Sequence, residues 1–214
     1  MRGYNPGWDR VLSHLEPHYL EAFTDIEQQN LIASHMASIE DIQFENWQEM
    51  DIEQMVGVLG SLENEIAKIQ HRPAMILSAE RLDENVFGQQ YGNRIELNSR
   101  ILESSKNNPD LLDAVLDTLI HEGRHAYQHY NVEERMVHQS QAEVNSWREN
   151  FNELGYKDGS PIAIQLIGPF SYTNSELTSL GARLYYYQPV ETDAREYAAD
   201  TMSKFRTLSP NTHA

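Results

Sequence analysis

The stretch NPDLLDAVLDTLIHEGRH, residues 108–125, decides how the chain folds around it. Asn108 is a good helix cap, Pro109 takes the first helical position, and Asp110 complements the helix dipole. Apolar residues then recur at helical spacing, at positions 111, 112, 115, 116, 119 and 120. Gly123 costs about 1 kcal/mol in a helix compared with alanine, which indicates close packing or a functional constraint. The sequence therefore predicts an amphipathic helix that runs into a polar motif at its end.

That motif is H-E-x-x-H, formed by His121, Glu122 and His125. Side chains four residues apart lie on one face of a helix, about 6 Å apart at Cβ, so two imidazoles can bind the same zinc ion. Glu122 lies beside them and can take a proton from a water molecule that zinc has acidified. We predict a Zn²⁺ site with His121 and His125 as ligands and Glu122 as general base. The alternative is that both histidines are ordinary helix residues and Glu122 is a solvated carboxylate.

A zinc site needs a third protein ligand, and a later acidic helix start supplies the candidates. The stretch PVETDAREYAAD, residues 189–200, begins with a proline and places Glu191 and Asp193 in its first turn. The helix dipole favours a carboxylate there, and the small residues at 194, 198 and 199 allow a neighbouring helix to approach closely. We predict Glu191 as the ligand, with Asp193 as its main competitor and Glu196 as the third candidate.

The remaining chain reads as helices followed by short strands. Thr24 or Asp25 is a suitable cap for one helix, and apolar residues recur at helical spacing over residues 52–69. Residues 73–77 are apolar like a buried strand, and residues 91–98 alternate as a half-exposed strand does. We predict an α+β, mainly helical fold. Its N-terminal helical region, residues 1–72, packs on the same domain as a core of residues 73–214.

Composition excludes several functions. Lys and Arg total 16 against 33 Asp and Glu, which gives a net charge of −17. Phosphate backbones and anionic membranes would repel such a chain, so we predict no nucleic acid and no membrane as partner, whereas a cationic partner suits it. The absence of cysteine excludes disulfides and thiolate ligands. Without an apolar secretory segment or an 18-residue apolar run, we expect a cytoplasmic protein, or one exported by a specialised secretion system.

Two stretches of the chain resemble zinc metallopeptidases. TLIHEGRHAYQ, residues 118–128, resembles the active-site helix of the zincins, and ETDAREYAA, residues 191–199, resembles the third-ligand helix of gluzincin-like families. The second stretch is similar to the E-x-x-A-x-x-F-A pattern of ImmA/IrrE-type peptidases, in which the position of Glu191 is the ligand. The H-E-x-R-H-A-Y-Q form after an I-x-L-N strand also resembles zincin domains of bacterial polymorphic toxins and effectors.

This resemblance spans about residues 73–205 and implies a zincin-like fold, with a cleft between the active-site helix and a small twisted sheet. The edge strand of such a sheet binds substrate as an added strand, and we expect residues 91–98 to have this role. The resemblance implies a zinc-dependent endopeptidase that hydrolyses a protein or peptide substrate. It would act as a bacterial toxin or effector, or as a regulatory protease, and an immunity or regulatory protein would then be a partner.

Three consecutive tyrosines, residues 185–187, precede the third-ligand helix. A tyrosine hydroxyl can donate a hydrogen bond to the oxyanion of an acyl-transfer reaction, and we choose Tyr186 for this role. The alternative is that the three rings are half-buried packing residues. Two other functions stay open: a non-catalytic interaction protein on a zincin scaffold, and metal-dependent hydrolysis of another amide, such as a peptidoglycan crosslink. The presence of Glu122 argues against the first, because a binding-only scaffold does not need it.

Overall fold

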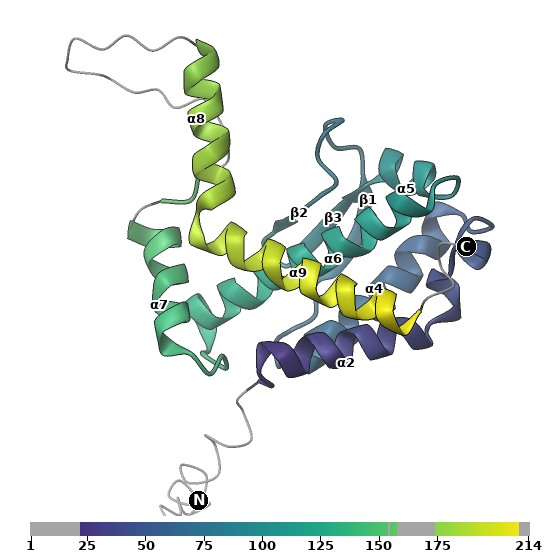
Figure 1. Ribbon diagram of the computed structural model, residues 1–214, viewed down its shortest axis with the longest axis horizontal. Helices are drawn as coiled ribbons and strands as arrows, with labels where there is room; N and C mark the ends of the chain where they lie inside the picture. Colours follow the sequence, from purple (N-terminus) through teal and green to yellow (C-terminus); the bar gives the residue numbers. More distant parts are fainter. Residues whose placement is uncertain (1–21, 154, 158–173, 210–214) are drawn as a thin grey trace, which may run out of the picture.

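Helices make up most of the computed structural model, which describes residues 22–153, 155–157 and 174–209 (Figure 1). The α-helices are α2 (Asp25–Ser38), α3 (Phe44–Trp47), α4 (Ile52–Ile69), α5 (Ser99–Ser105), α6 (Pro109–His129), α7 (Gln141–Arg148), α8 (Asn174–Tyr187) and α9 (Pro189–Leu208). A 3-10 turn at Glu40–Ile42 follows α2, and π-helical turns at Tyr130–Glu134 and Glu149–Glu153 extend α6 and α7. With one small sheet, this confirms the α+β, mainly helical class.

Side-chain caps explain where the long helices begin. Thr24 caps α2 and Asp51 caps α4, each through a capping box with the residue three positions later. Asn108 accepts a hydrogen bond from the backbone N–H of Asp110 at 2.9 Å and so caps α6. The predicted starts of these helices are confirmed, with Thr24 rather than Asp25 as the cap of α2. The last helix, α9, was predicted to begin after Pro189 and begins at Pro189 itself.

The sheet has three strands: β1 (Ile76–Glu80), β2 (Gly88–Tyr91) and β3 (Arg94–Asn98), in the order β1-β3-β2. β1 and β3 are parallel, and β2 and β3 form an antiparallel hairpin. The prediction of one edge strand over residues 91–98 is therefore wrong. Gly92 adopts a left-handed conformation, with φ of +58°, which allows a tight turn between β2 and β3. This hairpin leaves β3 in the centre of the sheet and β2 at its edge.

The predicted strand over residues 73–77 begins later, at Ile76, because the preceding residues are bound to α4. Arg72 and Glu63 form a fully buried ion pair, with Nη1 and Oε1 2.7 Å apart. The backbone N–H of Met75 donates to the same Glu63 oxygen at 2.9 Å. These bonds pair the buried charges of Arg72 and Glu63 and bind the backbone N–H of Met75. The backbone therefore begins to pair with β3 only after Met75.

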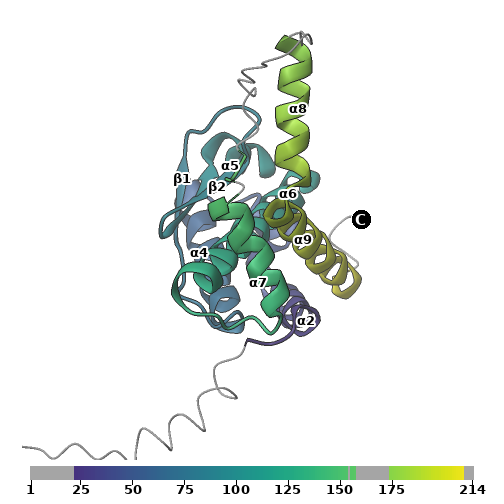
Figure 2. The same ribbon diagram turned by 90° about the vertical axis from the view of Figure 1, so that its left-hand side faces the viewer.

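α6 is the central element of the fold. Figure 2 shows the sheet on one side of α6 and α9 on the other, and α9 also lies against α2. One hydrophobic cluster joins α2, α4, β3, α6 and α9 through residues such as Ile32, Leu59, Ile95, Leu116 and Phe205. The described helices before residue 72 thus share a core with the later elements. No helix among the described residues is long and apolar enough to cross a membrane.

Candidate metal centre

Three possible metal ligands meet between α6 and α9. His121 and His125 lie one turn apart on α6, and their Nε2 atoms are 3.0 Å apart. Glu191 projects from the first turn of α9, with Oε2 3.4 Å from Nε2 of His121 and Oε1 3.2 Å from Nε2 of His125. The structure thus brings together the three residues that the sequence predicts as ligands. Their ligand atoms form a group that could hold a metal ion.

The spacing of these atoms suits a tetrahedral ion. Two ligand atoms that each lie about 2.1 Å from a tetrahedral centre are about 3.4 Å apart. The three observed separations, 3.0, 3.2 and 3.4 Å, are close to that value, with Oε1 of Glu191 facing His125 and Oε2 facing His121. Oε2 of Glu191 is also buried and has no hydrogen-bond partner among the described residues. Nε2 of His121 at 3.4 Å and Nη1 of Arg195 at 3.7 Å lie beside this oxygen without hydrogen-bonding it, and a cation would supply the close partner that it lacks.

Glu191 and His125 stabilise each other's charge at the site, and a metal ion would have to displace the proton that this interaction holds on His125. Burial raises the pKa of the Glu191 carboxyl, but its bonds to His121 and His125 outweigh this effect and hold the pKa far below its usual range. Burial lowers the pKa of His125, but the bond to Glu191 and the charge of Glu122 outweigh it and raise that pKa to about 8. The ionised Glu191 therefore attracts positive charge into a buried site.

A cleft of about 1220 Å³ opens onto this centre. His121, Glu122, His125 and Glu191 line it, and residues 88–90 of the edge strand β2 form part of its wall. Glu122 is 9% exposed, and its carboxylate forms no hydrogen bond or ion pair with any described residue. A water molecule or a substrate can therefore reach the carboxylate of Glu122 beside the two histidines.

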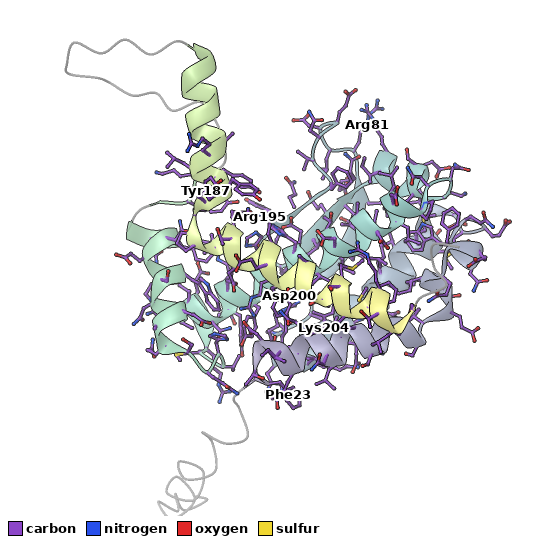
Figure 3. The ribbon with its side chains drawn as sticks, viewed as in Figure 1. Phe23, Arg81, Tyr187, Arg195, Asp200 and Lys204 are labelled. Atoms are coloured by element: carbon purple, nitrogen blue, oxygen red, sulfur yellow. The ribbon has the colours of Figure 1, made fainter. Side chains whose placement is uncertain are left out.

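The tyrosine at the cleft is not the one that we chose from sequence. Tyr185 lines the cleft, whereas Tyr186 does not line it and is 52% exposed. The guanidinium of Arg195 lies over the Tyr186 ring, 3.8 Å from its centroid, and Figure 3 shows Arg195 and Tyr187 near the junction of α8 and α9. Since successive helical residues point about 100° apart, only one of neighbouring tyrosines can face the cleft.

A second tyrosine, Tyr156, reaches the centre from the segment 155–157. Its hydroxyl donates to Oε1 of Glu191 at 2.6 Å, and its ring packs edge-on against Tyr185 at 6.3 Å. Burial raises the pKa of each hydroxyl, and the charge of Glu191 raises both further, so both stay protonated donors. Sequence reasoning missed Tyr156, because a residue in a turn far from the motif gives no spacing signal.

The alternative ligands have other surroundings. Asp193 accepts hydrogen bonds from Arg124 at 2.8 and 2.9 Å and from Gln128 at 2.6 Å. Burial raises the pKa of the Asp193 carboxyl, but the charge of Arg124 outweighs this effect and lowers it. Glu196 is exposed on the outer face of α9. The structure therefore groups Glu191 with the histidines and places Asp193 in a partly buried ion pair with Arg124.

A further group of acidic and histidine side chains, Asp25, His138 and Glu143, lies near the start of α2. Arg124 binds both oxygens of Asp25, at 2.9 and 2.7 Å. Nε2 of His138 lies 2.5 Å from Glu143, and Nδ1 lies 3.1 Å from the Tyr127 hydroxyl. These groups already have protein partners and a buried guanidinium beside them, which makes them a poor cation site.

Comparisons of the chain with protein-family models, curated proteins and solved structures found no match.

Proposed function

We propose that the protein is a zinc-dependent endopeptidase. The observation that carries the proposal is the convergence of His121, His125 and Glu191: the two Nε2 atoms are 3.0 Å apart, and each lies 3.2 to 3.4 Å from one of the two Glu191 carboxylate oxygens, in the lining of an open cleft. Two imidazoles and one carboxylate with an open fourth position are typical of catalytic rather than structural zinc sites. The resemblance of residues 118–128 and 191–199 to zincins supports the same reading.

Each residue around the centre can have a separate role in peptide hydrolysis. When bound, a zinc ion supplies Lewis acidity, which lowers the pKa of a water molecule and polarises the scissile carbonyl. Glu122 takes the proton of the attacking water and passes it to the leaving amine. Tyr185, which faces the cleft as a protonated donor, hydrogen-bonds the oxyanion. Tyr156 is the second donor, at present bound to Glu191.

The cleft favours an extended, positively charged substrate segment. β2 is an edge strand, and its residues 88–90 lie on the cleft wall, where a peptide can pair with them as an added strand. Beyond the metal centre, Asp110, Asp113, Asp117 and Glu133 line the cleft, and Arg206 is the one arginine among its described lining residues. Arg206 pairs with Asp113 at 2.8 Å, and Glu133 lies 3.6 Å from His129. Such a lining attracts lysine and arginine side chains. A toxin or regulatory setting stays a prediction from the resemblance alone.

The first test is zinc content, measured by elemental analysis after purified protein has been loaded and washed free of unbound metal. We expect about one zinc per wild-type chain. Glu191→Ala should lose most of it, because the ligand from α9 is gone. Glu196→Ala is the matched control, since Glu196 is an exposed glutamate on the same helix, and this variant should keep its zinc. Wild-type protein without zinc would overturn the proposal.

The second test separates metal binding from catalysis. Glu122→Gln should bind zinc like the wild type, because the carboxylate is not one of the ligands. It should lower kcat for peptide cleavage by about 10²- to 10⁴-fold, the usual contribution of a general base. Cleavage products of a peptide library, identified by mass spectrometry, give the measurement. Equal cleavage by both proteins would show that a contaminating protease is responsible.

A further inference from the structure

Gln128 lies at the junction of the two helices that carry the candidate ligands. It is fully buried on α6, one turn after His125. Its Oε1 is 2.8 Å from Nδ1 of His125, and its Nε2 donates to the carbonyl of Val190 at 2.9 Å and to Oδ2 of Asp193 at 2.6 Å. One side chain therefore contacts a histidine ligand and the residue immediately before Glu191.

The orientation of the Gln128 amide follows from its partners. The carbonyl of Val190 and the carboxylate of Asp193 can only accept hydrogen bonds, so the NH₂ group of Gln128 must face them. Both of its hydrogens are used there, and Oε1 is left to face His125. That oxygen can only accept, so Nδ1 of His125 must carry a hydrogen. A neutral imidazole with its hydrogen on Nδ1 has a free lone pair on Nε2, the atom that faces His121 and Glu191.

Asp193 is itself held in place by other side chains, so it is a fixed acceptor for the amide of Gln128. The Arg124 guanidinium binds Asp193 on one side and Asp25 of α2 on the other, with all four distances between 2.7 and 2.9 Å. Arg124 is fully buried, and its guanidinium also lies over the ring of Tyr197 at 4.4 Å. This network fixes the acceptor that Gln128 needs and connects α2 with the ligand-bearing turn of α9.

We infer that Gln128 is a positioning residue of the metal centre. It selects the tautomer of His125 that offers Nε2 to a metal ion, and it sets the distance between His125 on α6 and Glu191 on α9. The inference rests on the metal binding in the proposed function, but its first readout needs neither metal nor turnover. Partners that hold a ligating imidazole in this way usually change metal affinity by about 10- to 100-fold.

The experiment measures the tautomer of His125 by ¹⁵N NMR of histidine-labelled, metal-free protein, at a pH alkaline enough to leave the imidazoles neutral. The wild type is compared with Gln128→Met, which keeps the length and apolar bulk of the side chain but has no hydrogen-bonding group. The matched control is Gln70→Met. Gln70 is also a fully buried glutamine, and its hydrogen bonds go to Tyr197 and Arg72 rather than to a ligand.

We expect His125 to carry its hydrogen on Nδ1 in the wild type and in Gln70→Met. In Gln128→Met the hydrogen should shift to Nε2, where Glu191 can accept it at 3.2 Å. Zinc affinity, measured by competition with a chelator, should fall about 10- to 100-fold in Gln128→Met and change less than threefold in Gln70→Met. A hydrogen on Nε2 in the wild type, or unchanged tautomer and affinity in Gln128→Met, would overturn the inference.

A second variant decides the matter if Gln128→Met does not fold. Gln128→Glu keeps an acceptor for His125 but removes both donors and places a carboxylate against Asp193. It should keep the hydrogen on Nδ1, lose zinc affinity, and change the visible spectrum of the cobalt-loaded protein, which reports the ligand geometry. A spectrum and affinity like those of the wild type would show that Gln128 does not set the spacing. Absence of zinc binding in the wild type would instead contradict the proposed function, and the tautomer would still report on Gln128.

Discussion

At the scale of single residues, two glutamates in one cleft have opposite surroundings. Glu191 is 1% exposed and lies against His121, His125 and the Tyr156 hydroxyl. Glu122 borders the cleft and has no hydrogen-bonding partner among the described residues. A metal ligand must be held in a fixed position, whereas a general base must reach solvent and move its proton. Their surroundings therefore suit Glu191 for binding and Glu122 for proton transfer.

Tyr185 and Tyr186 provide a prediction at the same scale. Tyr185→Phe removes a hydroxyl from the cleft, and we expect it to lower kcat by about 10²- to 10³-fold while KM changes little, because an oxyanion donor acts mainly in the transition state. Steady-state kinetics on one cleaved peptide give the measurement. Tyr186→Phe is the comparison, since this exposed hydroxyl lies outside the cleft. A larger loss in Tyr186→Phe would restore the choice made from sequence.

At the scale of secondary-structure elements, the packing of α6 on α4 explains the glycine inside the H-E-x-x-H motif. A Cβ at Gly123 would lie 3.1 Å from Nη2 of Arg72 and 3.4 Å from Oε2 of Glu63. These two side chains form the buried ion pair between α4 and the sheet, and Arg72 also bonds Gln70. The guanidinium is held on several sides and cannot withdraw. Close packing therefore explains why glycine stands in this helix despite its cost. It is one of the two explanations that we gave for Gly123 from the sequence.

We therefore expect Gly123→Ala to destabilise the fold, although alanine is the better helix former. The gain in helix propensity is about 1 kcal/mol, and overpacking against a buried ion pair costs about 1–3 kcal/mol. The net loss in the free energy of unfolding should be about 0–2 kcal/mol, measured by urea denaturation. Gly57→Ala on α4 is the matched control, because its Cβ would meet no atom within 4 Å. This control should become more stable, and an equal gain in Gly123→Ala would contradict the packing argument.

The elements also show how far the sequence could predict the structure. α6 begins where its cap and proline indicate, and α9 begins at its proline. The dipole left Glu191 and Asp193 both open as ligands, and the resemblance to ImmA/IrrE-type peptidases pointed to Glu191. Alternation alone did not separate the β2–β3 hairpin from one strand, but the Gly92-Asn93 pair between the two strands is a hairpin-turn signal that the prediction missed. Tyr156 and Gln128 depend on contacts between distant segments, which no local pattern records.

At the scale of the whole molecule, the excess of negative charge extends to side chains that line the cleft. The net charge is −17, and Asp117 lines the cleft one turn before His121 without a hydrogen bond or ion pair to any described residue. A lysine side chain beside it would gain about 1 kcal/mol at 4 Å in solvent, or about fivefold in affinity, and this gain should shrink in high salt.

This charge can be tested with peptides bound to zinc-loaded Glu122→Gln, which should not cleave them. We expect a lysine peptide to bind about fivefold more tightly than its norleucine analogue, by fluorescence anisotropy at low salt. Adding Asp117→Asn should reduce the difference. The control for net charge is Asp200→Asn, which removes an exposed carboxylate on α9 that is labelled in Figure 3. This substitution should leave the difference between the two peptides unchanged. Equal binding of both peptides would contradict an electrostatic preference.

Metal binding should also stabilise the molecule as a whole, because its ligands come from two helices that are distant in the chain: α6 ends at His129 and α9 begins at Pro189. A ligand that binds only the folded state stabilises it by about 2.7 kcal/mol at 100 times its Kd. For a chain of this size, that corresponds to a rise in Tm of roughly 5–10 °C. Differential scanning calorimetry with and without zinc measures it.

The same experiment locates the ion. Glu196→Ala should show the wild-type rise in Tm, and Glu191→Ala should show little or none, because the carboxylate that joins α9 to the site is missing. A chelator should reverse the rise in the wild type. An undiminished rise in Glu191→Ala would place the zinc elsewhere, with Asp25, His138 and Glu143 as the alternative group to examine. In that case the three-ligand centre between α6 and α9 would have to be abandoned as the zinc site, since a genuine site cannot lose its buried carboxylate without losing affinity.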